Sequence, residues 1–174
     1  MFLMKLQVVD NFFDNFQNIE QEIKKISLYP RDEFNKKFGD AQKWPGFRSE
    51  AIHKSSPLLF NLFLKEFKQK FLCQQEFNID FYLHLRLGED QEKDWIHKDP
   101  SHMGLIIYLK DHKESGTDFY YEDSDDIHMS IRSVKNRCIL FDAATRHKSI
   151  LNYGKNLEEG RLTLNGFIYF KNNG

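Results

Sequence analysis

The stretch Phe81-Tyr82-Leu83-His84-Leu85-Arg86-Leu87 alternates apolar and polar side chains without a break. Successive side chains of a β-strand point to opposite faces of the sheet, so this period of two predicts a strand with one apolar and one polar face. The apolar face needs cover from the hydrophobic core. The polar face, with its histidine and arginine, is expected to line a cavity on the other side of the sheet.

Two amphipathic segments before this strand can provide that cover. Ser56-Pro57 predicts a helix start, because Ser caps helices and Pro suits the first turn, and the helix is expected over about 57–72. A shorter helix is expected after a cap at Asp14. A strand is predicted over 3–9, and residues 28–50 are expected to be irregular. The apolar stripes of the two helices are Leu59, Phe63, Phe67 and Phe71, and Phe16, Ile19, Ile23 and Ile26.

The rest of the chain reads as short strands separated by turn-forming residues. They are expected over 104–109, 117–121, 128–133, 135–141, 147–152 and 161–170. Helices followed by about seven or eight strands predict an α+β fold whose sheets form a sandwich or barrel. The chain of 174 residues, taken as 1–174, is expected to be one domain.

Composition narrows the classes of partner. The net charge of −1 and a pI of ≈ 6.7 argue against a nucleic-acid partner, which usually requires a basic surface. The apolar N-terminus lacks a signal-peptide cleavage site, and no apolar run reaches membrane-spanning length. Two cysteines, Cys73 and Cys138, give no disulfide framework. A cytoplasmic protein without membrane contact is therefore expected.

Downstream of the first long strand lies Trp95-Ile96-His97-Lys98-Asp99. The His97 and Asp99 side chains would point to the same side of an extended segment and could bind one ion. A single His-x-Asp is a weak pattern, but a second histidine, His147, begins a later predicted strand. Two histidines and one carboxylate form a facial triad, which leaves positions on Fe(II) open for substrate and O₂.

An arginine follows His147 after fourteen residues, at the start of the last predicted strand. An antiparallel return of the chain can bring Arg161 into the same cavity as His147. Thr163 would share the face of Arg161, two residues along the strand. A buried arginine is very costly without a partner, and a bound dicarboxylate would supply one.

The order His97-x-Asp99, His147 and Arg161-x-Thr163 resembles the iron(II)- and 2-oxoglutarate-dependent dioxygenase superfamily, in particular its small prolyl 4-hydroxylase-like members. Ile106-Ile107-Tyr108-Leu109 and the later Ser115-Gly116-Thr117-Asp118-Phe119 are similar to a strand and a glycine turn of those enzymes. Lys110 stands where their strand usually has asparagine. The resemblance implies a double-stranded β-helix, a jelly-roll or cupin-like barrel, with the N-terminal helices packed on one sheet.

The resemblance also implies roles for individual residues. His97, Asp99 and His147 would be the catalytic metal ligands of Fe(II), and Arg161, Thr163 and Tyr108 would bind the cosubstrate 2-oxoglutarate. The expected activity is that of an oxidoreductase: a hydroxylase that consumes O₂ and 2-oxoglutarate and releases succinate and CO₂. Its substrate would be a protein prolyl residue or a small molecule.

Two other functions stay open from the sequence. One is a nucleic-acid demethylase of the same superfamily, although the run from Arg161 to Phe167 lacks the second arginine of those enzymes. The other is a cupin-like metal-binding protein without catalysis, which would not need Arg161.

The sequence gives less information about the substrate-binding side of the site. Loops 30–53 and 111–127 are the expected lids. Trp44 and Trp95 could line the substrate mouth or pack in the core. Arg48 could anchor an anionic substrate group or form a surface salt bridge, the commoner outcome.

Overall fold

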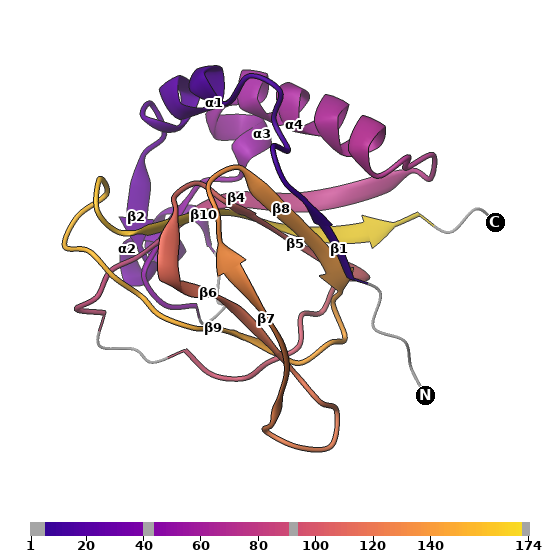
Figure 1. Ribbon diagram of the computed structural model, residues 1–174. Coiled ribbons are helices and arrows are strands. Elements are labelled where there is room, and N and C mark those ends of the chain that lie inside the picture. The colour runs from indigo at the N-terminus through magenta and orange to yellow at the C-terminus, as the bar shows by residue number, and fades with distance from the viewer. Residues whose placement is uncertain (1–5, 40–43, 91–93, 172–174) are drawn as a thin grey trace.

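Two antiparallel sheets face each other, and helices cover the outer face of the larger one (Figure 1). The computed structural model describes residues 6–39, 44–90 and 94–171. The helices are α1 (Phe16–Ile23), α2 (Arg31–Phe38), α3 (Ile52–Ser55) and α4 (Pro57–Lys70). The strands are β1 (Leu6–Val9), β2 (Leu28–Pro30), β3 (Phe47–Ser49), β4 (Phe77–Arg86), β5 (Met103–Tyr108), β6 (His112–Tyr120), β7 (Ile127–Ser133), β8 (Arg137–Asp142), β9 (His147–Ser149) and β10 (Arg161–Phe170).

The larger sheet has the strand order β1-β8-β5-β10-β4-β3-β2, so the last strand of the chain lies in its middle. Strand β10 pairs with β4 along its whole length, with Arg161 opposite Arg86 and Thr163 opposite His84. On its other side, β10 pairs with β5, which places Tyr108 beside Thr163. The predicted polar faces of β4 and β10 therefore lie side by side.

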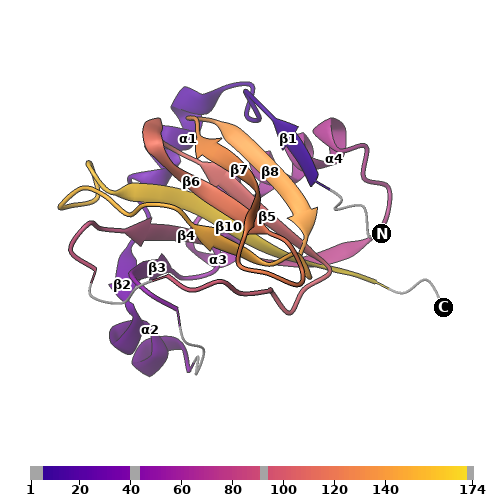
Figure 2. The ribbon, with the colours of Figure 1, turned by 60° about the horizontal axis from the view of Figure 1, so that its bottom comes forward.

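The smaller sheet has the order β7-β6-β9 and lies across from the larger one, as the turned view in Figure 2 also shows. Residue His97 extends this sheet by a single antiparallel bridge to His147, the first residue of β9. The chain thus brings the His-x-Asp stretch against the strand that carries the second histidine.

The main hydrophobic core lies between the helices and the larger sheet, as the alternation in β4 predicted. Phe81, Leu83 and Leu85 share a cluster with Phe63 and Phe67 of α4. The rings of Phe63 and Phe81 are stacked with centroids 4.2 Å apart. Packing this face under the helices leaves the polar face of the same strands toward the smaller sheet.

Several local predictions need correction. The side chain that caps α1 belongs to Asn15, which accepts a hydrogen bond from the Asn18 N–H, and not to Asp14. The segment 28–50 is not irregular, since it holds β2, α2 and β3. Both expected lids also contain regular structure. The segment 111–127 includes β6, and the segment 30–53 includes α2 and β3. Short strands such as β2 and β3 form by pairing, β2 with β3 and β3 with β4, and have too few residues to show a period.

The boundaries of α4 and β1 agree more closely with the predicted segments. Ser56 caps α4, and Pro57 occupies its first turn, as predicted. Residues 3–5 of the first predicted strand lie outside the described residues, and the remainder is β1. No helix in the described part of the chain is long and apolar enough to cross a membrane.

Candidate active site

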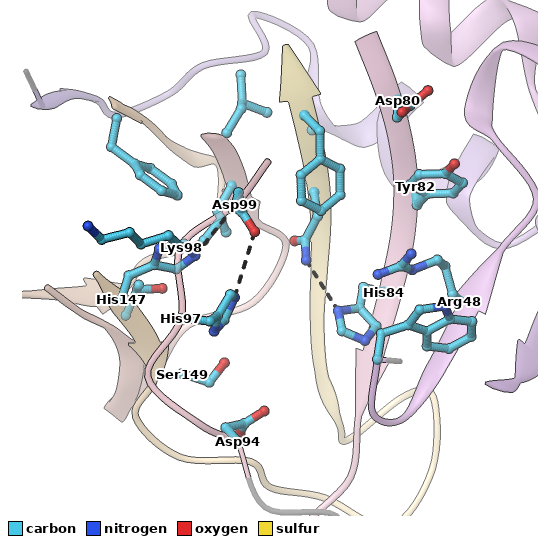
Figure 3. A pocket seen from close by; sticks show the side chains of 18 of the residues that line it. Arg48, Asp80, Tyr82, His84, Asp94, His97, Lys98, Asp99, His147 and Ser149 are labelled. Atoms are coloured by element: carbon cyan, nitrogen blue, oxygen red, sulfur yellow. Dashed lines mark hydrogen bonds and ion pairs between the residues drawn. The ribbon is translucent and has the colours of Figure 1, made fainter. Parts of the chain in front are cut away.

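His97, Asp99 and His147 converge at one end of the space between the sheets (Figure 3). One potential ligand atom from each residue lies within 4.8 Å of the others. The Asp99 carboxylate is 3.4 Å from His147 Nε2 and 3.8 Å from His97 Nε2. Among the described residues this is the one such cluster of histidine and carboxylate groups, and neither His102 nor His128 joins it.

Backbone hydrogen bonds fix the three side chains relative to one another. His97 and His147 exchange two backbone hydrogen bonds, of 3.0 and 2.9 Å. The Asp99 N–H donates to the Ala143 carbonyl at 2.9 Å. The two-residue spacing then puts the Asp99 and His97 side chains on the same side of this extended segment, as the sequence indicated.

Each histidine ring is oriented by a carbonyl two residues before it. His97 Nδ1 lies 2.9 Å from the Trp95 carbonyl, and His147 Nδ1 lies 2.9 Å from the Thr145 carbonyl. A carbonyl only accepts, so Nδ1 carries the proton in both rings and Nε2 keeps its lone pair. Both lone pairs belong to the atoms that face Asp99, which is the orientation that a metal requires.

Burial favours the neutral forms of His147 and Asp99. Burial lowers the pKa of His147 to about 4, helped by the neighbouring His97, while the hydrogen bond to Thr145 opposes the shift. Burial also raises the pKa of Asp99, and the charges of His97 and Arg48 oppose that rise. His147 is therefore already neutral at physiological pH, the state in which histidine binds metals.

A cavity of about 310 Å³ extends from this triad across the polar face of the larger sheet. Its walls come from β3, β4 and β10, the His-x-Asp stretch and β9. Trp44 and Trp95 both line it, the first buried and the second about half exposed. Both tryptophans therefore contact the cavity, which is one of the two roles that the sequence left open for them.

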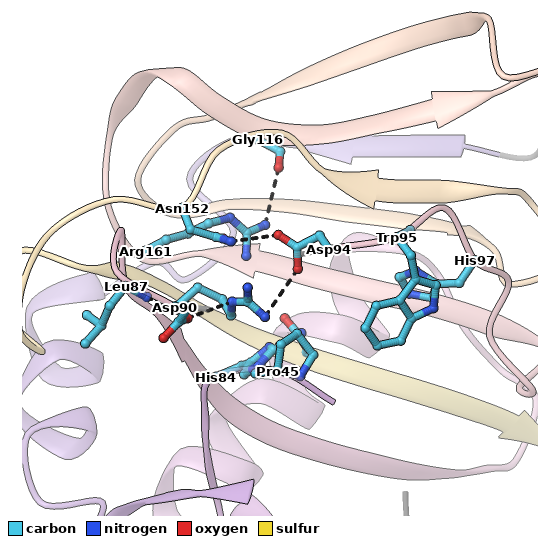
Figure 4. Close-up of polar contacts among 12 residues, drawn as sticks. Pro45, His84, Leu87, Asp90, Asp94, Trp95, His97, Gly116, Asn152 and Arg161 are labelled. Carbon is cyan, nitrogen blue, oxygen red and sulfur yellow. Dashed lines mark hydrogen bonds and ion pairs between the residues drawn. The ribbon is translucent and has the colours of Figure 1, made fainter. Parts of the chain in front are cut away.

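Arg161 lines the same cavity and is 3% exposed. Its guanidinium donates to the Gly116 carbonyl at 3.3 Å (Figure 4). Gly116 cannot be replaced without shifting the backbone, since an added Cβ would lie 2.0 Å from the Ile131 carbonyl oxygen. Among the described residues, neither Arg161 Nε nor the Thr163 hydroxyl oxygen has a hydrogen-bond partner. Such buried donors are costly unless a ligand satisfies them.

Tyr108 is fully buried near Arg161, but its hydroxyl donates to Thr117 at 2.7 Å. The Arg161 guanidinium lies 6.0 Å from the Tyr108 ring centroid. Tyr108 thus supports Thr117, which lines the cavity, and its ring borders the arginine. Lys110, which follows this strand, hydrogen-bonds the Leu157 and Glu158 carbonyls and so fixes the loop that leads into β10.

The sequence did not point to an ion-pair network beside Arg161. Arg86, which is 1% exposed, pairs with Asp90 at 2.9 Å and with Asp94 at 3.3 Å (Figure 4). The second carboxylate oxygen of Asp94 accepts a hydrogen bond from Asn152 at 2.7 Å. This network ties the start of the His-x-Asp stretch to β4 and to the loop after β9. The alternation of β4 predicted that Arg86 faces inward, but nothing local in the sequence singles out Asp94.

His84, also in the cavity wall, has both ring nitrogens engaged. Its Nε2 donates to the Pro45 carbonyl at 2.7 Å, and its Nδ1 lies 3.2 Å from the Asn165 amide nitrogen. Burial, followed by the charge of Arg48, lowers the pKa of His84 to about 3, so this residue is a neutral part of the wall.

The sequence matches no family model and no curated protein. Solved structures do match. HygX from Streptomyces hygroscopicus, with nickel and 2-oxoglutarate bound, superposes with a TM-score of 0.68 at 10% identity, covering 95% of this chain and 83% of that one. A Pseudomonas putida prolyl-4-hydroxylase gives 0.58 at 13% identity, covering 97% and 94%. A 2OG-Fe(II) oxygenase family protein from Burkholderia pseudomallei gives 0.63 at 11% identity, covering 94% and 84%.

This chain has the fold of the 2OG-Fe(II) oxygenases. The predicted double-stranded β-helix with N-terminal helices on one sheet is thereby confirmed. In this 2OG-Fe(II) oxygenase fold, the candidate metal triad and Arg161 lie between the two sheets.

Proposed function

We propose that this chain is an Fe(II)- and 2-oxoglutarate-dependent oxygenase, with His97, Asp99 and His147 as iron ligands. The observation that carries the proposal is the combination of this triad with a buried arginine in one cavity. A cupin-like protein that only bound metal would have no need for the buried arginine.

The residues present fit both groups. Two Nε2 lone pairs and one carboxylate within 4.8 Å form the donor set that suits Fe(II) and leaves coordination positions open. Arg161 Nε and the Thr163 hydroxyl supply unsatisfied buried groups for a far carboxylate of 2-oxoglutarate. Tyr108 would complete this end through its ring and through Thr117, rather than by a free hydroxyl.

The protein's part in the reaction is binding, orientation and exclusion of water. The Trp95 and Thr145 carbonyls would hold the two imidazoles in the tautomer that binds metal. Arg161 would fix the cosubstrate by a two-pronged contact in a cavity shielded by the smaller sheet. The oxidising power would come from bound iron, O₂ and 2-oxoglutarate, whose decarboxylation releases succinate and CO₂.

For the substrate, we propose hydroxylation of a small molecule or of a single prolyl side chain. A cavity of about 310 Å³ is at the lower end of the range of ligand sites, ~300–1,000 Å³, and part of it would hold the cosubstrate. The near-neutral charge of the chain gives no support to a nucleic-acid substrate.

The decisive test is binding, followed by turnover. Anaerobic calorimetry with Fe(II) or Mn(II), and then with 2-oxoglutarate, should show metal binding and a cosubstrate affinity that depends on the metal. Aerobic incubation with small-molecule and peptide fractions should then release succinate and yield a product heavier by one oxygen atom. Metal binding without any 2-oxoglutarate binding would leave only the metal-binding role and defeat the proposal.

A further inference from the structure

Two buried arginines lie opposite each other on the polar face of the larger sheet. Arg161 of β10 pairs in register with Arg86 of β4, and the two residues are 3% and 1% exposed. Side chains directly opposite on one face have Cβ atoms ~5 Å apart, so the two positive charges repel each other. Burial lowers the pKa of Arg161, and the charge of Arg86 adds to that shift. This pair requires negative groups beside it, because buried like charges are costly.

Two carboxylates from the segment after β4 supply that negative charge. The Asp90 carboxylate lies 2.9 Å from Arg86 Nε, and the Asp94 carboxylate lies 3.3 Å from Arg86 Nη1 (Figure 4). Asp90 also accepts a hydrogen bond from the Leu87 N–H at 3.0 Å, which holds it at the end of β4. Of the two carboxylates, Asp94 lines the cavity and Asp90 does not.

The charge of Asp94 acts on Arg161 as well as on Arg86. Tyr108, Asp94 and Tyr153 oppose the fall in the pKa of Arg161 that burial causes. Burial raises the pKa of both tyrosines, so their phenols are uncharged at neutral pH. Asp94 is therefore the charged member of these three neighbours, and it shares the cavity with Arg161.

A hydrogen bond fixes the Asp94 carboxylate in this position. Its second oxygen accepts from the Asn152 amide at 2.7 Å, and its side chain is 17% exposed. The Asn152 Oδ1 atom is buried and has no hydrogen-bond partner among the described residues. The carboxylate is thus held between β4 and the loop after β9, and its charge cannot move freely into solvent.

A bound cosubstrate would bring another negative charge to the same place. The two arginines and the two aspartates already cancel each other in charge. The far carboxylate of a dicarboxylate held by Arg161 would therefore lie in the attractive field of the arginines and the repulsive field of Asp94. In a cavity shielded from water both fields are strong, so the charge of Asp94 offsets part of the attraction by Arg161.

We propose that Asp94 is a specificity-determining residue that limits the affinity for 2-oxoglutarate by repelling its far carboxylate. The inference rests on the proposed function and adds to it a means of setting cosubstrate affinity. A 2-oxo acid with an uncharged far end would not experience this repulsion, so Asp94 narrows the advantage of 2-oxoglutarate over such acids. Loss of an ion pair that served structure alone would weaken cosubstrate binding, whereas loss of this charge strengthens it.

2-Oxoglutarate and 2-oxopentanoate are a matched pair of probes. Both are 2-oxo acids of the same chain length, but the second ends in a methyl group where the first has its far carboxylate. The full chain, loaded with Mn(II), is titrated anaerobically with each probe in a calorimeter. Asp94→Asn should bind 2-oxoglutarate at least about fivefold more tightly than wild type, and 2-oxopentanoate within about twofold. The new amide keeps the size of the side chain and can donate to Asn152 Oδ1.

Asp90→Asn is the matched control, since it removes the same charge from the same arginine at a position outside the cavity. It should leave both affinities within about twofold of wild type. Unchanged or weaker binding of 2-oxoglutarate in Asp94→Asn would make the residue a structural one and overturn the proposal. Equal tightening of both probes, or equal tightening in Asp90→Asn, would overturn it too, because the effect would not depend on the far carboxylate or on the cavity.

Two further variants guard against a folding defect. Asp94→Ser makes the same charge change with a smaller side chain, and the same outcomes decide if Asp94→Asn does not fold. If neither neutral variant has the far-UV circular dichroism spectrum of wild type, Asp94 is required for folding and the proposal fails. Asp94→Glu keeps the charge and should not tighten 2-oxoglutarate binding, and tightening there would contradict the charge argument.

The two proposals fail in different ways. A wild-type protein that binds Mn(II) but no 2-oxoglutarate would remove the proposed function, and this inference with it. A wild-type protein that binds 2-oxoglutarate, without tightening in Asp94→Asn, would remove the role of Asp94 and leave the proposed function intact.

Discussion

His97 and His147 share one backbone arrangement, in which the carbonyl two residues earlier accepts from Nδ1. The sequence alone predicted the three candidate metal ligands by type and order, and the structure brings their side chains together. It could not predict the tautomer, because that depends on the local backbone. Both rings present the Nε2 lone pair. The loss of either histidine therefore removes a metal-ligand atom that no described neighbour can replace.

We therefore expect His147→Ala or His97→Ala to lower Fe(II) or Mn(II) affinity at least a hundredfold, because an open three-ligand site depends on every donor. The far-UV circular dichroism spectrum should stay unchanged, since the site lies outside the main core. Calorimetric titration with Mn(II) measures the effect. His102→Ala is the control, since His102 lies outside the triad, and it should bind like wild type.

Arg161→Ala should weaken 2-oxoglutarate binding by about 2–5 kcal/mol, because the carboxylate would lose a charged partner in a buried site. Arg161→Lys should recover only part of this, as an ammonium cannot donate in a two-pronged geometry. Titration of the Mn(II)-loaded protein with 2-oxoglutarate gives the values, and metal affinity should hardly change. An affinity within twofold of wild type in Arg161→Ala would remove the cosubstrate assignment.

At the scale of elements, β4 illustrates what a local pattern can and cannot predict. Its alternation correctly indicated both faces, because the helix-covered face must be apolar for a strand in that position. The four residues from Phe77 to Asp80 were missed at its start, where Asn78 and Asp80 lower the strand signal. Strands β2 and β3 have three residues each. They form through pairing of β2 with β3 and of β3 with β4, so no local sequence pattern predicts them.

Helix α4 shows how this packing supports the site from outside. Phe63 is fully buried between the helix and β4, with its ring on Phe81. Phe63→Ala should lower the free energy of unfolding by about 3–5 kcal/mol, the usual cost of a large cavity in a core. Urea denaturation measures the loss. Phe60→Ala, on the same helix at a partly buried position, should cost clearly less, and equal losses would contradict this account of the core.

At the scale of the whole molecule, buried neutral histidines couple folding to pH. The pKa of His84 is about 3 in the folded protein, against an ordinary value of 6.5. As the pH falls, His84 is therefore protonated in the unfolded chain before it is protonated in the folded protein. The contribution of neutral His84 to the free energy of unfolding is fully present above pH 6.5. It is lost as the pH falls toward 3, by about 1.4 kcal/mol per pH unit.

The metal-free protein should consequently show a free energy of unfolding that decreases between pH 6.5 and 4. In His84→Gln, whose amide can still donate to the Pro45 carbonyl, this slope should be smaller by about 1 kcal/mol per pH unit. Asp99 acts in the opposite direction because its pKa is raised, so the comparison of slopes matters rather than either slope alone. Identical slopes in the two proteins would mean that His84 accepts a proton while folded.

The single bridge between His97 and His147 has a mechanical consequence. Two backbone hydrogen bonds, together with the one from Asp99 to Ala143, join the His-x-Asp segment to the chain around β9. An ion held by residues on both sides of this seam would act as a cross-link that closes the open edge of the smaller sheet. Metal binding should then raise the melting temperature and slow amide hydrogen exchange at His97, Asp99 and His147 far more than in α4.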